Sequence, residues 1–440
     1  MARIVVVGAG PAGLAAAQAA ARAGVSVLLV DSAASVGGQY WRQSAVGAVR
    51  RPVHPLVEWL PSSAVWGIEV RADRVLLRVQ SGPADAPGRL MSTVEGSAVV
   101  LATGAYDRVL PVPGWDLPGV YSAGAGQAMA KGQGVAVGKR VVVAGTGPFL
   151  LPVACSLLDF GAEVVGVMEA SGVREQVGWW RDPVGVVGKV GELGRYVTRL
   201  AYSRVEMQMR AAVVAVHGDR RVEAVTVARL RPDWTVVPGS GRVVDVDAVC
   251  LGFGFTAQLE LAVSAGCRVE DGAVVVDGAQ RTSVPRVFAA GELTGVAGAW
   301  AAVAEGTVAG YTAAADCVDS QVVPPTPALK RAAAGRRFGR VLRSVYRVKK
   351  GWHGWVSDDT VLCRCEEIRW ADLRDQLAQG VLGTRALRLN SRAGLGLCQG
   401  RVCGRNVADL TGLPDSANRP IALPVRLSDL ATADLPKEST

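Results

Sequence analysis

The sequence predicts an α/β fold in which two Rossmann-like, dinucleotide-binding domains, the second inserted in the first, precede a small α-rich domain at the C-terminus. The pattern strand, glycine turn, helix, strand occurs over residues 3–31 and again over 139–169, which indicates an internal duplication. Of the 440 residues, 50% are hydrophobic and only 5% aromatic, with Ala and Val in excess. This composition is typical of Val-rich strands packed against helices of small residues. The C-terminal domain is indicated by four of the eight cysteines, which fall within residues 363–403.

In the first unit, an apolar strand leads into Gly8, Gly10 and Gly13, spaced G-x-G-x-x-G where a helix begins. The first glycine permits a tight turn, the second lets a pyrophosphate approach the backbone, and the third lets the helix pack on the sheet. The helix N-terminus offers N–H groups and a positive dipole end to the phosphates. Asp31, at the end of the next strand, is placed to accept hydrogen bonds from ribose hydroxyls. The motif predicts a dinucleotide rather than an empty structural turn, but it does not separate FAD from NAD or another adenine nucleotide.

Three further segments favour FAD: "VGGQYWR" (36–42), "ATG" (102–104) at the end of a strand, and "AAGE" (289–292) before a helix. With them the chain resembles the flavoproteins that have two dinucleotide-binding domains. In those proteins the last turn usually carries Gly-Asp, and the Asp holds the ribityl chain of the flavin. Here the pair is Gly-Glu, so the resemblance implies a ribityl contact from a longer side chain. The predicted cofactor-binding residues are Gly8, Gly10, Pro11, Ala12, Gly13, Asp31, Ser32, Gly37, Gly38, Gln39, Thr103, Gly104, Gly291 and Glu292.

The second unit has Gly145 and Gly147, but Leu150 occupies the third glycine position. A leucine there should push the helix away from the strand or crowd a bound dinucleotide. Glu169 ends the second strand and would disfavour a 2′-phosphate, so a cofactor here would be NAD rather than NADP. Because the third glycine is missing, the preferred interpretation is that this unit is degenerate: it keeps its fold and no longer binds nicotinamide.

The cysteines of the C-terminal region are spaced C-x-C at Cys363 and Cys365 and C-x4-C at Cys398 and Cys403. Four thiolates can hold a [2Fe–2S] cluster. Zinc is the competing ligand, although structural zinc sites usually pair cysteines two to four residues apart. Four unrelated buried thiols are the third interpretation. The other cysteines lie in apolar strands or helices and are expected to be small core residues: Cys155, Cys250, Cys267 and Cys317.

Other features exclude several classes of function. No cysteine pair of the redox type precedes residue 363, and no catalytic residue is assigned. The net charge is +9, with nine Lys and Arg residues in 330–350; we expect an exposed basic helix or a docking surface, and no nucleic-acid partner, because no binding motif accompanies the charge. Glycines and prolines interrupt the uncharged run 141–158, so no transmembrane segment is expected. The absence of a visible signal peptide favours a cytoplasmic location.

The chain also resembles a particular group of flavoproteins. "SRAGLGLCQGRVCG" (391–404) resembles the bacterioferritin-associated-ferredoxin type of [2Fe–2S] domain. With "ATGAYDRVLPVPGWDLPGVYSAGAGQAM" (102–129) and "GTGPFLLPVA" (145–154), residues 1–410 resemble the FAD-containing α subunit of heteromeric amino-acid and opine dehydrogenases. Opine oxidases, hydrogen cyanide synthase and the hydroxyproline or proline dehydrogenase complexes belong to this group.

The resemblance implies that a separate amine-oxidase-type β subunit, with its own flavin, oxidises a C–N bond and passes electrons to this chain. It also allows an FMN at a subunit interface and a small ferredoxin-like subunit. The chain would then relay electrons between a flavin and a [2Fe–2S] cluster. Two alternatives remain open: a free-standing NADH-dependent reductase, and a scaffold that binds zinc and an adenine nucleotide.

The expected domains follow this order of motifs. Residues 1–118 and 246–322 would form the FAD-binding domain, and 119–245 the inserted second domain. Residues 323–350 would hold a proline-containing linker and the basic helix. Residues 351–440 would hold the [2Fe–2S] domain and a polar tail.

Overall fold

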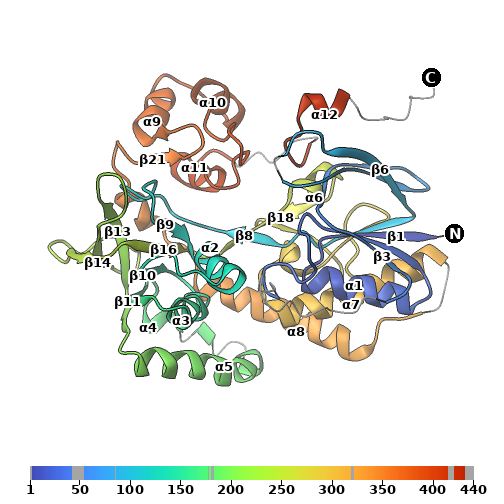
Figure 1. Cartoon of the computed structure of the whole chain (residues 1–440), viewed down its shortest axis with the longest axis horizontal. Coiled ribbons are helices and arrows are strands. Elements are labelled where there is room, and N and C mark those ends of the chain that lie inside the picture. Colours follow the sequence, from blue (N-terminus) through green and yellow to red (C-terminus); the bar gives the residue numbers. More distant parts are fainter. Residues whose placement is uncertain are drawn as a thin grey trace. The chain divides into compact units, whose positions relative to one another are not determined.

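The computed structural model describes residues 2–41, 54–84, 86–176, 178–179, 183–318, 322–414 and 421–431. The chain forms two compact units (Figure 1). Unit 1 consists of Met1–Tyr106, Thr256–Arg340 and Ala417–Thr440, and unit 2 of Asp107–Phe255 and Val341–Ser416. Part of unit 2 is therefore inserted in the sequence of unit 1, and the predicted α/β fold with an inserted second domain is confirmed.

Unit 1 is built on a parallel sheet that places the first glycine turn at its carboxyl edge. Its five strands are, in order across the sheet, β20 (Val287–Ala289), β7 (Ala98–Leu101), β1 (Arg3–Val7), β2 (Ser26–Val30) and β3 (Val57–Leu60). Apolar residues fill the strands because a parallel sheet is covered on both faces. An antiparallel sheet joins β4 (Ser63–Val70), β5 (Val75–Ser81) and β6 (Leu90–Gly96).

Two helices of small residues pack closely on one face of this sheet, α1 (Pro11–Arg22) and α7 (Ala299–Val318). Figure 1 shows them side by side. A Cβ atom placed on Gly306 of α7 would lie 2.0 Å from the carbonyl oxygen of Ala12. Only glycine permits this approach, which brings α7 against the first turn of α1.

Unit 2 repeats this plan. Its parallel sheet has the order β12 (Glu206–Met209), β11 (Glu163–Glu169), β10 (Arg140–Gly145), β16 (Ala248–Gly252) and β9 (Val120–Ser122). Its antiparallel sheet joins β13 (Ala211–His217), β14 (Ala224–Arg229) and β15 (Arg242–Asp245). The matching sheets confirm the internal duplication that the sequence predicts.

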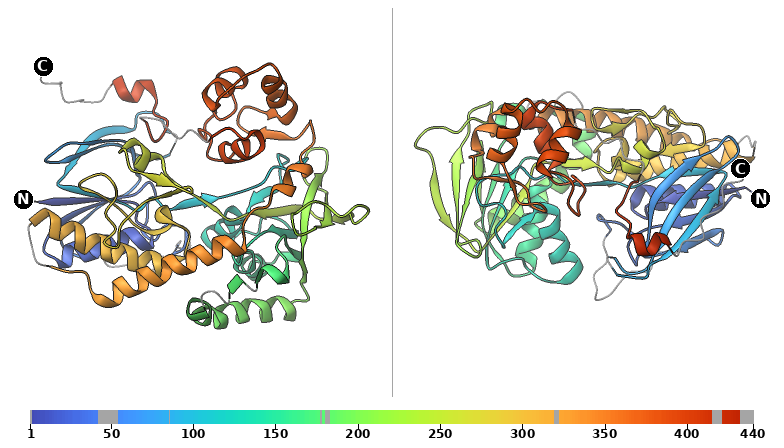
Figure 2. Two further views of the ribbon diagram at one scale, coloured as in Figure 1. Left: turned by 180° about the vertical axis from the view of Figure 1, so that it is seen from behind. Right: turned by 90° about the horizontal axis from the view of Figure 1, so that it is seen from above.

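The cysteine region folds as a small helical module within unit 2 (Figure 2). It contains η4 (Lys350–Trp355), the hairpin β21 (Val361–Cys363) and β22 (Ile368–Arg369), and the helices α9 (Trp370–Ala378), α10 (Thr384–Ser391) and α11 (Gly404–Thr411). Several contacts tie this module to residues 108–115 of the same unit. They join Trp115 Nε1 to the Val361 carbonyl, Asn406 Nδ2 to the Val109 carbonyl at 2.7 Å, and Arg108 to Asp409 as an ion pair.

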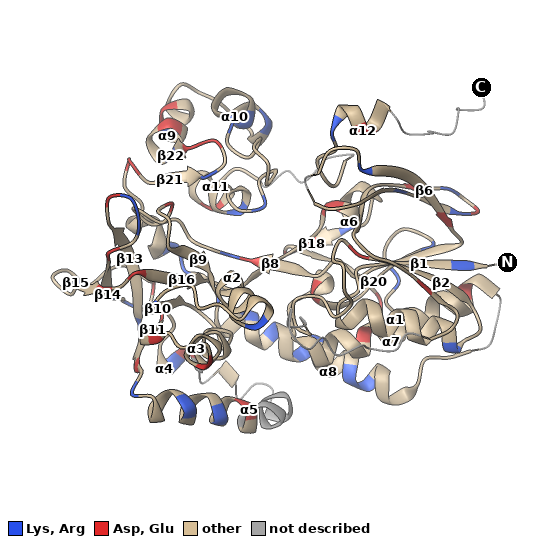
Figure 3. Ribbon diagram, viewed as in Figure 1, with Lys and Arg blue, Asp and Glu red and all other residues tan. Residues whose placement is uncertain are grey.

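The basic segment forms α8 (Thr326–Val345), which carries Lys and Arg along its length (Figure 3). The helix begins within the predicted linker, since Pro327 is tolerated in a first helical turn, and it ends before residue 350. None of the described helices is long and apolar enough to cross a membrane. The remaining elements are β8 (Ala105–Asp107), α2 (Ala123–Ala128), η1 (Met129–Gln133), α3 (Leu150–Asp159), α4 (Val173–Gln176), α5 (Pro183–Tyr202), β17 (Phe255–Ala257), α6 (Glu260–Ser264), β18 (Val269–Glu270), β19 (Ala273–Val274), η3 (Gly291–Thr294) and α12 (Leu427–Ala431).

Candidate functional site

The first glycine turn connects β1 to α1, and each glycine has a different surrounding. A Cβ atom on Gly8 would lie 2.3 Å from the carbonyl oxygen of Ala102, and one on Gly13 would lie 1.7 Å from the carbonyl oxygen of Gly8. Both therefore serve packing within the protein. A Cβ atom on Gly10 would meet only the Cα of Gly38, at 4.0 Å. The space beside Gly10 is thus open to a ligand, as a pyrophosphate site requires.

Gly38 is brought to this turn by the segment after β2. The N–H of Gly37 donates to the carbonyl oxygen of Ala9 at 2.8 Å. Gly38 has φ +58°, and a Cβ atom on it would lie 2.8 Å from the Cα of Gly10. The backbones of Gly10 and Gly38 therefore face each other at the N-terminus of α1. Gly10 is the N-cap residue of this helix, so no side chain caps its first N–H groups. Free N–H groups at a helix N-terminus suit a phosphate.

Asp31 holds the turn as well as facing the expected ribose position. Its Oδ2 accepts the N–H of Ala9 at 2.5 Å, and its Oδ1 accepts the N–H of Ala33 at 2.7 Å. A carboxylate has about four acceptor positions, so capacity remains for ribose hydroxyls. Ser32 and Gln39, also predicted to bind the cofactor, are exposed. Arg42, quoted within the same segment, lies outside the described residues.

The "ATG" segment forms an open loop at the end of β7. Thr103 donates through Oγ1 to the carbonyl oxygen of Gln258 at 2.8 Å, and the N–H of Gln258 donates to the carbonyl oxygen of Gly104 at 2.9 Å. Gly104 has φ +75°, and a Cβ atom on it would meet nothing within 4 Å. The loop is therefore fixed through Thr103 while Gly104 leaves a free space next to it.

The Gly291–Glu292 pair lies in the short turn η3, against the start of α1. A Cβ atom on Gly291 would lie 2.8 Å from the Cβ of Ala12. Glu292 is half-buried, and burial raises the pKa of its carboxyl, with no hydrogen bond from the described residues to oppose that effect. An unpartnered, partly buried carboxyl is costly unless it contacts another polar group. Its surroundings therefore suit the hydroxyl groups of a bound flavin.

The second glycine turn, between β10 and α3, has a different backbone. Gly147 has φ +111°, whereas the corresponding Gly10 is extended at φ −73°. The α3 helix begins at Leu150, whose side chain is 1% exposed in the core of unit 2. Leucine at the third position is thus accommodated by a changed turn, as the sequence predicts for a side chain in a place meant for glycine.

The carboxyl of Glu169 accepts hydrogen bonds from the second glycine turn and the residues next to it. It accepts the Thr146 hydroxyl at 2.7 Å, the Gly147 N–H at 2.8 Å and the Ser171 N–H at 2.7 Å. Burial raises the pKa of Glu169 against these hydrogen bonds. The carboxyl therefore has three protein donors at the position where a nicotinamide dinucleotide would offer its ribose.

Tyr346, which the sequence does not single out, lies on the second turn. A Cβ atom on Gly147 would lie 3.9 Å from Cγ of the Tyr346 ring. The ring packs edge-on against Trp179, with 5.9 Å between centroids. The nearest atom to a Cβ on Gly147 thus belongs to an aromatic side chain, whereas at Gly10 it belongs to another glycine.

The four C-terminal cysteines lie in two thiol pairs. Cys363 pairs by a hydrogen bond with Cys403, and Cys365 pairs with Cys398. The hydrogen bond with Cys403 lowers the pKa of Cys363, helped by the Gly394 N–H, which lies 3.4 Å from Cys363 Sγ. Among the described residues, no group of three or more His, Cys, Asp or Glu side chains is arranged to hold a metal ion.

The C-x-C loop is anchored by its middle residue, which the sequence analysis also missed. The guanidinium of Arg364 lies 5.1 Å from the centroid of the Trp115 ring and donates to the Asp116 carbonyl at 3.2 Å. Trp115 lies in the quoted segment 102–129, but no local pattern links it to the cysteines. Contact between residues so far apart in sequence becomes visible only in the fold.

The two units and the open first turn define a flavoprotein with two dinucleotide-binding domains. Residues 2–307 match the family described as pyridine nucleotide-disulphide oxidoreductase, and the chain belongs to this family. It is an FAD-dependent oxidoreductase. All eight cysteines are free, and those outside the C-terminal module lie apart in the core, Cys317 partly exposed.

Individual relatives place the chain more closely. It is 30% identical over 472 residues to one subunit of the opine oxidase from Agrobacterium tumefaciens, covering 97% of this chain and 91% of that protein. It is 31% identical over 436 residues to hydrogen cyanide synthase subunit HcnB of Pseudomonas aeruginosa, covering 91% and 90%. The resemblance to this group is confirmed. The solved structure of L-proline dehydrogenase from P. horikoshii has a TM-score of 0.65 at 17% identity, covers 98% of this chain and 80% of that chain, and supports the fold alone.

Proposed function

We propose that this chain is the electron-transfer α subunit of a heteromeric dehydrogenase or oxidase that oxidises a C–N bond of an amino acid or opine. The observation that carries the proposal is the presence, in one chain of the flavin fold, of four cysteines paired at short range. The names of the relatives, which are subunits of an opine oxidase and of hydrogen cyanide synthase, support the substrate class and the assembly.

FAD would be held by the residues around the first turn. Gly10 and Gly38 would leave the space that the pyrophosphate needs, Asp31 would bind the ribose, and Glu292 offers a carboxyl without a hydrogen-bond partner among the described residues. When bound, the flavin supplies two-electron redox chemistry, while the protein binds it, orients it and tunes its electronics.

The four cysteines would hold a [2Fe–2S] cluster. The donor set fits, because four thiolates are its usual ligands, and the Gly394 N–H already points at Cys363 Sγ. Hydrogen bonds to sulfur and nearby positive charge tune the potential of such a centre. Arg388, whose charge acts on Cys403, supplies one such charge. Zinc is the competing occupant of the same thiolates.

The second unit is proposed to bind no nicotinamide dinucleotide. The Tyr346 ring lies beside the glycine that a pyrophosphate would approach, and Glu169 accepts three hydrogen bonds from its own turn. This speaks against a free-standing NADH-dependent reductase.

Electrons would instead come from a partner, for which we propose an amine-oxidase-type flavoprotein β subunit. The same proposal includes a cytoplasmic location, an FMN at a subunit interface and a small ferredoxin-like subunit.

The test is anaerobic purification of the full chain, followed by a visible spectrum, identification of the released nucleotide, and assay of iron and sulfide. FAD with about two irons and two sulfides per chain would support the relay. Iron with a non-flavin adenine nucleotide would leave the cluster and remove the flavin end of the relay. Zinc in place of iron would contradict the electron-transfer function.

A further inference from the structure

Glu305 is a buried acid in α7 that the sequence analysis did not single out. Its side chain is 3% exposed. Its Oε2 accepts the N–H of Gly291 at 2.9 Å and the hydroxyl of Thr294 at 3.0 Å. Both donors belong to η3, the turn that presents Glu292. The carboxyl of Glu305 therefore fastens α7 to the turn proposed to contact the flavin.

The side-chain amide of Gln280 interacts with the same carboxyl, but without the geometry of a hydrogen bond. It is fully buried, and neither atom of its amide has a hydrogen-bond partner among the described residues. Its φ of +67° is unusual for a residue other than glycine. Unpaired buried amide atoms and a strained backbone both cost stability, and such costs tend to persist at functional positions.

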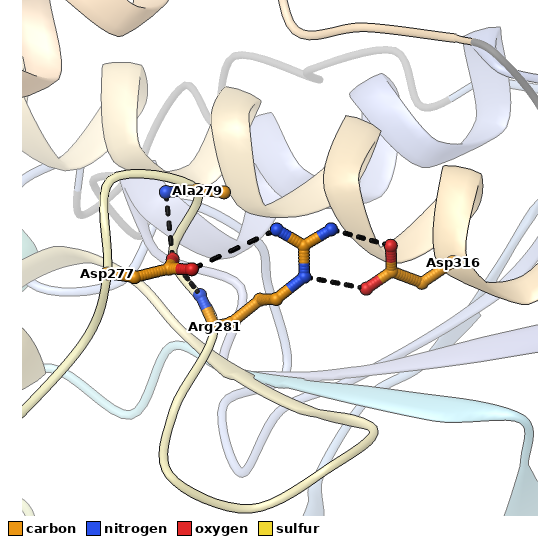
Figure 4. A network of polar contacts seen from close by, with 4 residues as sticks. All are labelled: Asp277, Ala279, Arg281 and Asp316. Carbon is orange, nitrogen blue, oxygen red and sulfur yellow. Dashed lines mark hydrogen bonds and ion pairs between the residues drawn. The ribbon is translucent and has the colours of Figure 1, made fainter.

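A surface network holds the residues on either side of Gln280, Ala279 and Arg281 (Figure 4). Asp277 accepts the N–H groups of Ala279 and Arg281 at 2.8 and 2.9 Å. The guanidinium of Arg281 binds both oxygens of Asp316, at 2.9 and 2.7 Å. Asp316 lies on α7, as Glu305 does, so the network joins the Gln280 loop to the helix that carries Glu305.

The charged groups around Glu305 are few. Arg336 of α8 faces it, with one buried guanidinium nitrogen unpaired among the described residues, and Glu292 lies in the adjoining turn. Burial raises the pKa of Glu305 to about 7, against the hydrogen bonds of η3 and the charge of Arg336. Both protonation states are therefore accessible near neutral pH. A protonated carboxyl would donate to Gln280 Oε1, which now lacks a donor.

We propose that Glu305 positions the turn that contacts the flavin and takes up one proton when the bound flavin is reduced. The protonated carboxyl then donates a hydrogen bond to the side chain of Gln280. The electrons come from the reductant and the proton from solvent, so no other reactant is needed. The added proton offsets negative charge that arrives near a buried carboxylate. This inference rests on the proposed assignment of the Gly291–Glu292 turn to the flavin.

The test is the midpoint potential of the flavin in the full chain, measured by dithionite titration from pH 5.5 to 8.5. We expect the potential of the wild type to change slope near pH 7, and Glu305→Gln, an isostere of the protonated acid, to remove that change while FAD content stays normal. The matched control is Glu169→Gln in unit 2, which removes a half-buried acid that also has a raised pKa and should leave the change of slope in place.

The proposal is overturned if the midpoint potential of the wild type changes with pH at a constant slope. It is also overturned if the change of slope is still present in Glu305→Gln. If Glu305→Gln fails to fold, Gln280→Leu replaces it, because it removes the amide that interacts with the carboxyl and should move the change of slope along the pH axis. An unmoved slope change in Gln280→Leu also overturns the proposal. The assignment of the turn is judged separately: normal FAD affinity in Glu292→Ala contradicts that assignment, whatever the pH profile shows.

Discussion

Gly10 and Gly38 lie so close together that a Cβ atom on Gly38 would be 2.8 Å from the Cα of Gly10. A Cβ atom on Gly10 would meet only the Cα of Gly38 among the described residues, at 4.0 Å. The contact fixes the segment after β2 over the N-terminus of α1. The free side of Gly10 is the space in which we place the pyrophosphate of FAD.

Gly10→Val should empty this site while keeping the fold, because Gly10 has an extended backbone that valine adopts readily. Crowding of about 1–3 kcal/mol would weaken FAD binding roughly 10- to 100-fold. FAD content and Kd check this. The control is Gly191→Ala, at a position in α5 with nothing within 4 Å. Full FAD occupancy in the valine variant would contradict the placement of the pyrophosphate.

Cys398→Ser should abolish the cluster and spare the flavin. We expect iron and sulfide to fall from about two each per chain to near zero, because three thiolates do not complete the ligand set. Metal and sulfide assays measure the loss, and the flavin spectrum shows what is retained. Cys267→Ser removes a buried thiol of unit 1 and should change neither. Normal iron in Cys398→Ser would exclude Cys398 as a ligand.

Tyr346→Ala should let unit 2 bind NADH. The wild type is expected to bind with a Kd weaker than about 1 mM, since the ring lies beside Gly147. Tyr346→Phe keeps the ring and is the matched control. Calorimetric titration with NADH separates the two variants, and equal affinity in both would show that the ring is not what closes the turn.

Glu305 should make the protein less stable as pH rises. Its pKa is raised from 4.5 to about 7 in the folded chain, so between these values the folded state binds more protons than the unfolded state, and stability falls with increasing pH. The shift corresponds to about 3 kcal/mol. Thermal unfolding at pH 5 and pH 8 should show a larger drop for the wild type than for Glu305→Gln. Equal drops would place the pKa of Glu305 near its ordinary value.

Much of the fold follows from local pattern. The glycines of 8–13, the alternation of strand and helix, and the repeat at 139–169 predict two parallel sheets, because each feature is short-range and has a single structural reading. The spacing of the four cysteines predicts a single cluster site. The structure brings the thiols into two pairs, and among the described residues no three of them are arranged to hold a metal ion.

The rest depends on contacts between residues distant in sequence. Leu150 signals a changed second turn, but nothing near it indicates that Tyr346 would lie beside Gly147. A lone acid within the Ala-rich run 299–315 is the one signal that could have pointed to Glu305. Its partners come from separate segments, and only tertiary packing brings them together.

The contacts of Asn406 with Val109 and of Trp115 with Val361 bear on how such chains can be recombined. The cysteine module follows a proline-containing segment, which suggests a cassette that could be exchanged between proteins. Its binding surface, however, lies some 250 residues earlier in the sequence, at residues 108–115. A transplanted module would bring its cysteines but leave behind Trp115, the indole that holds Arg364 between two of them. Natural shuffling or laboratory grafting would therefore have to move two separate stretches of the gene together.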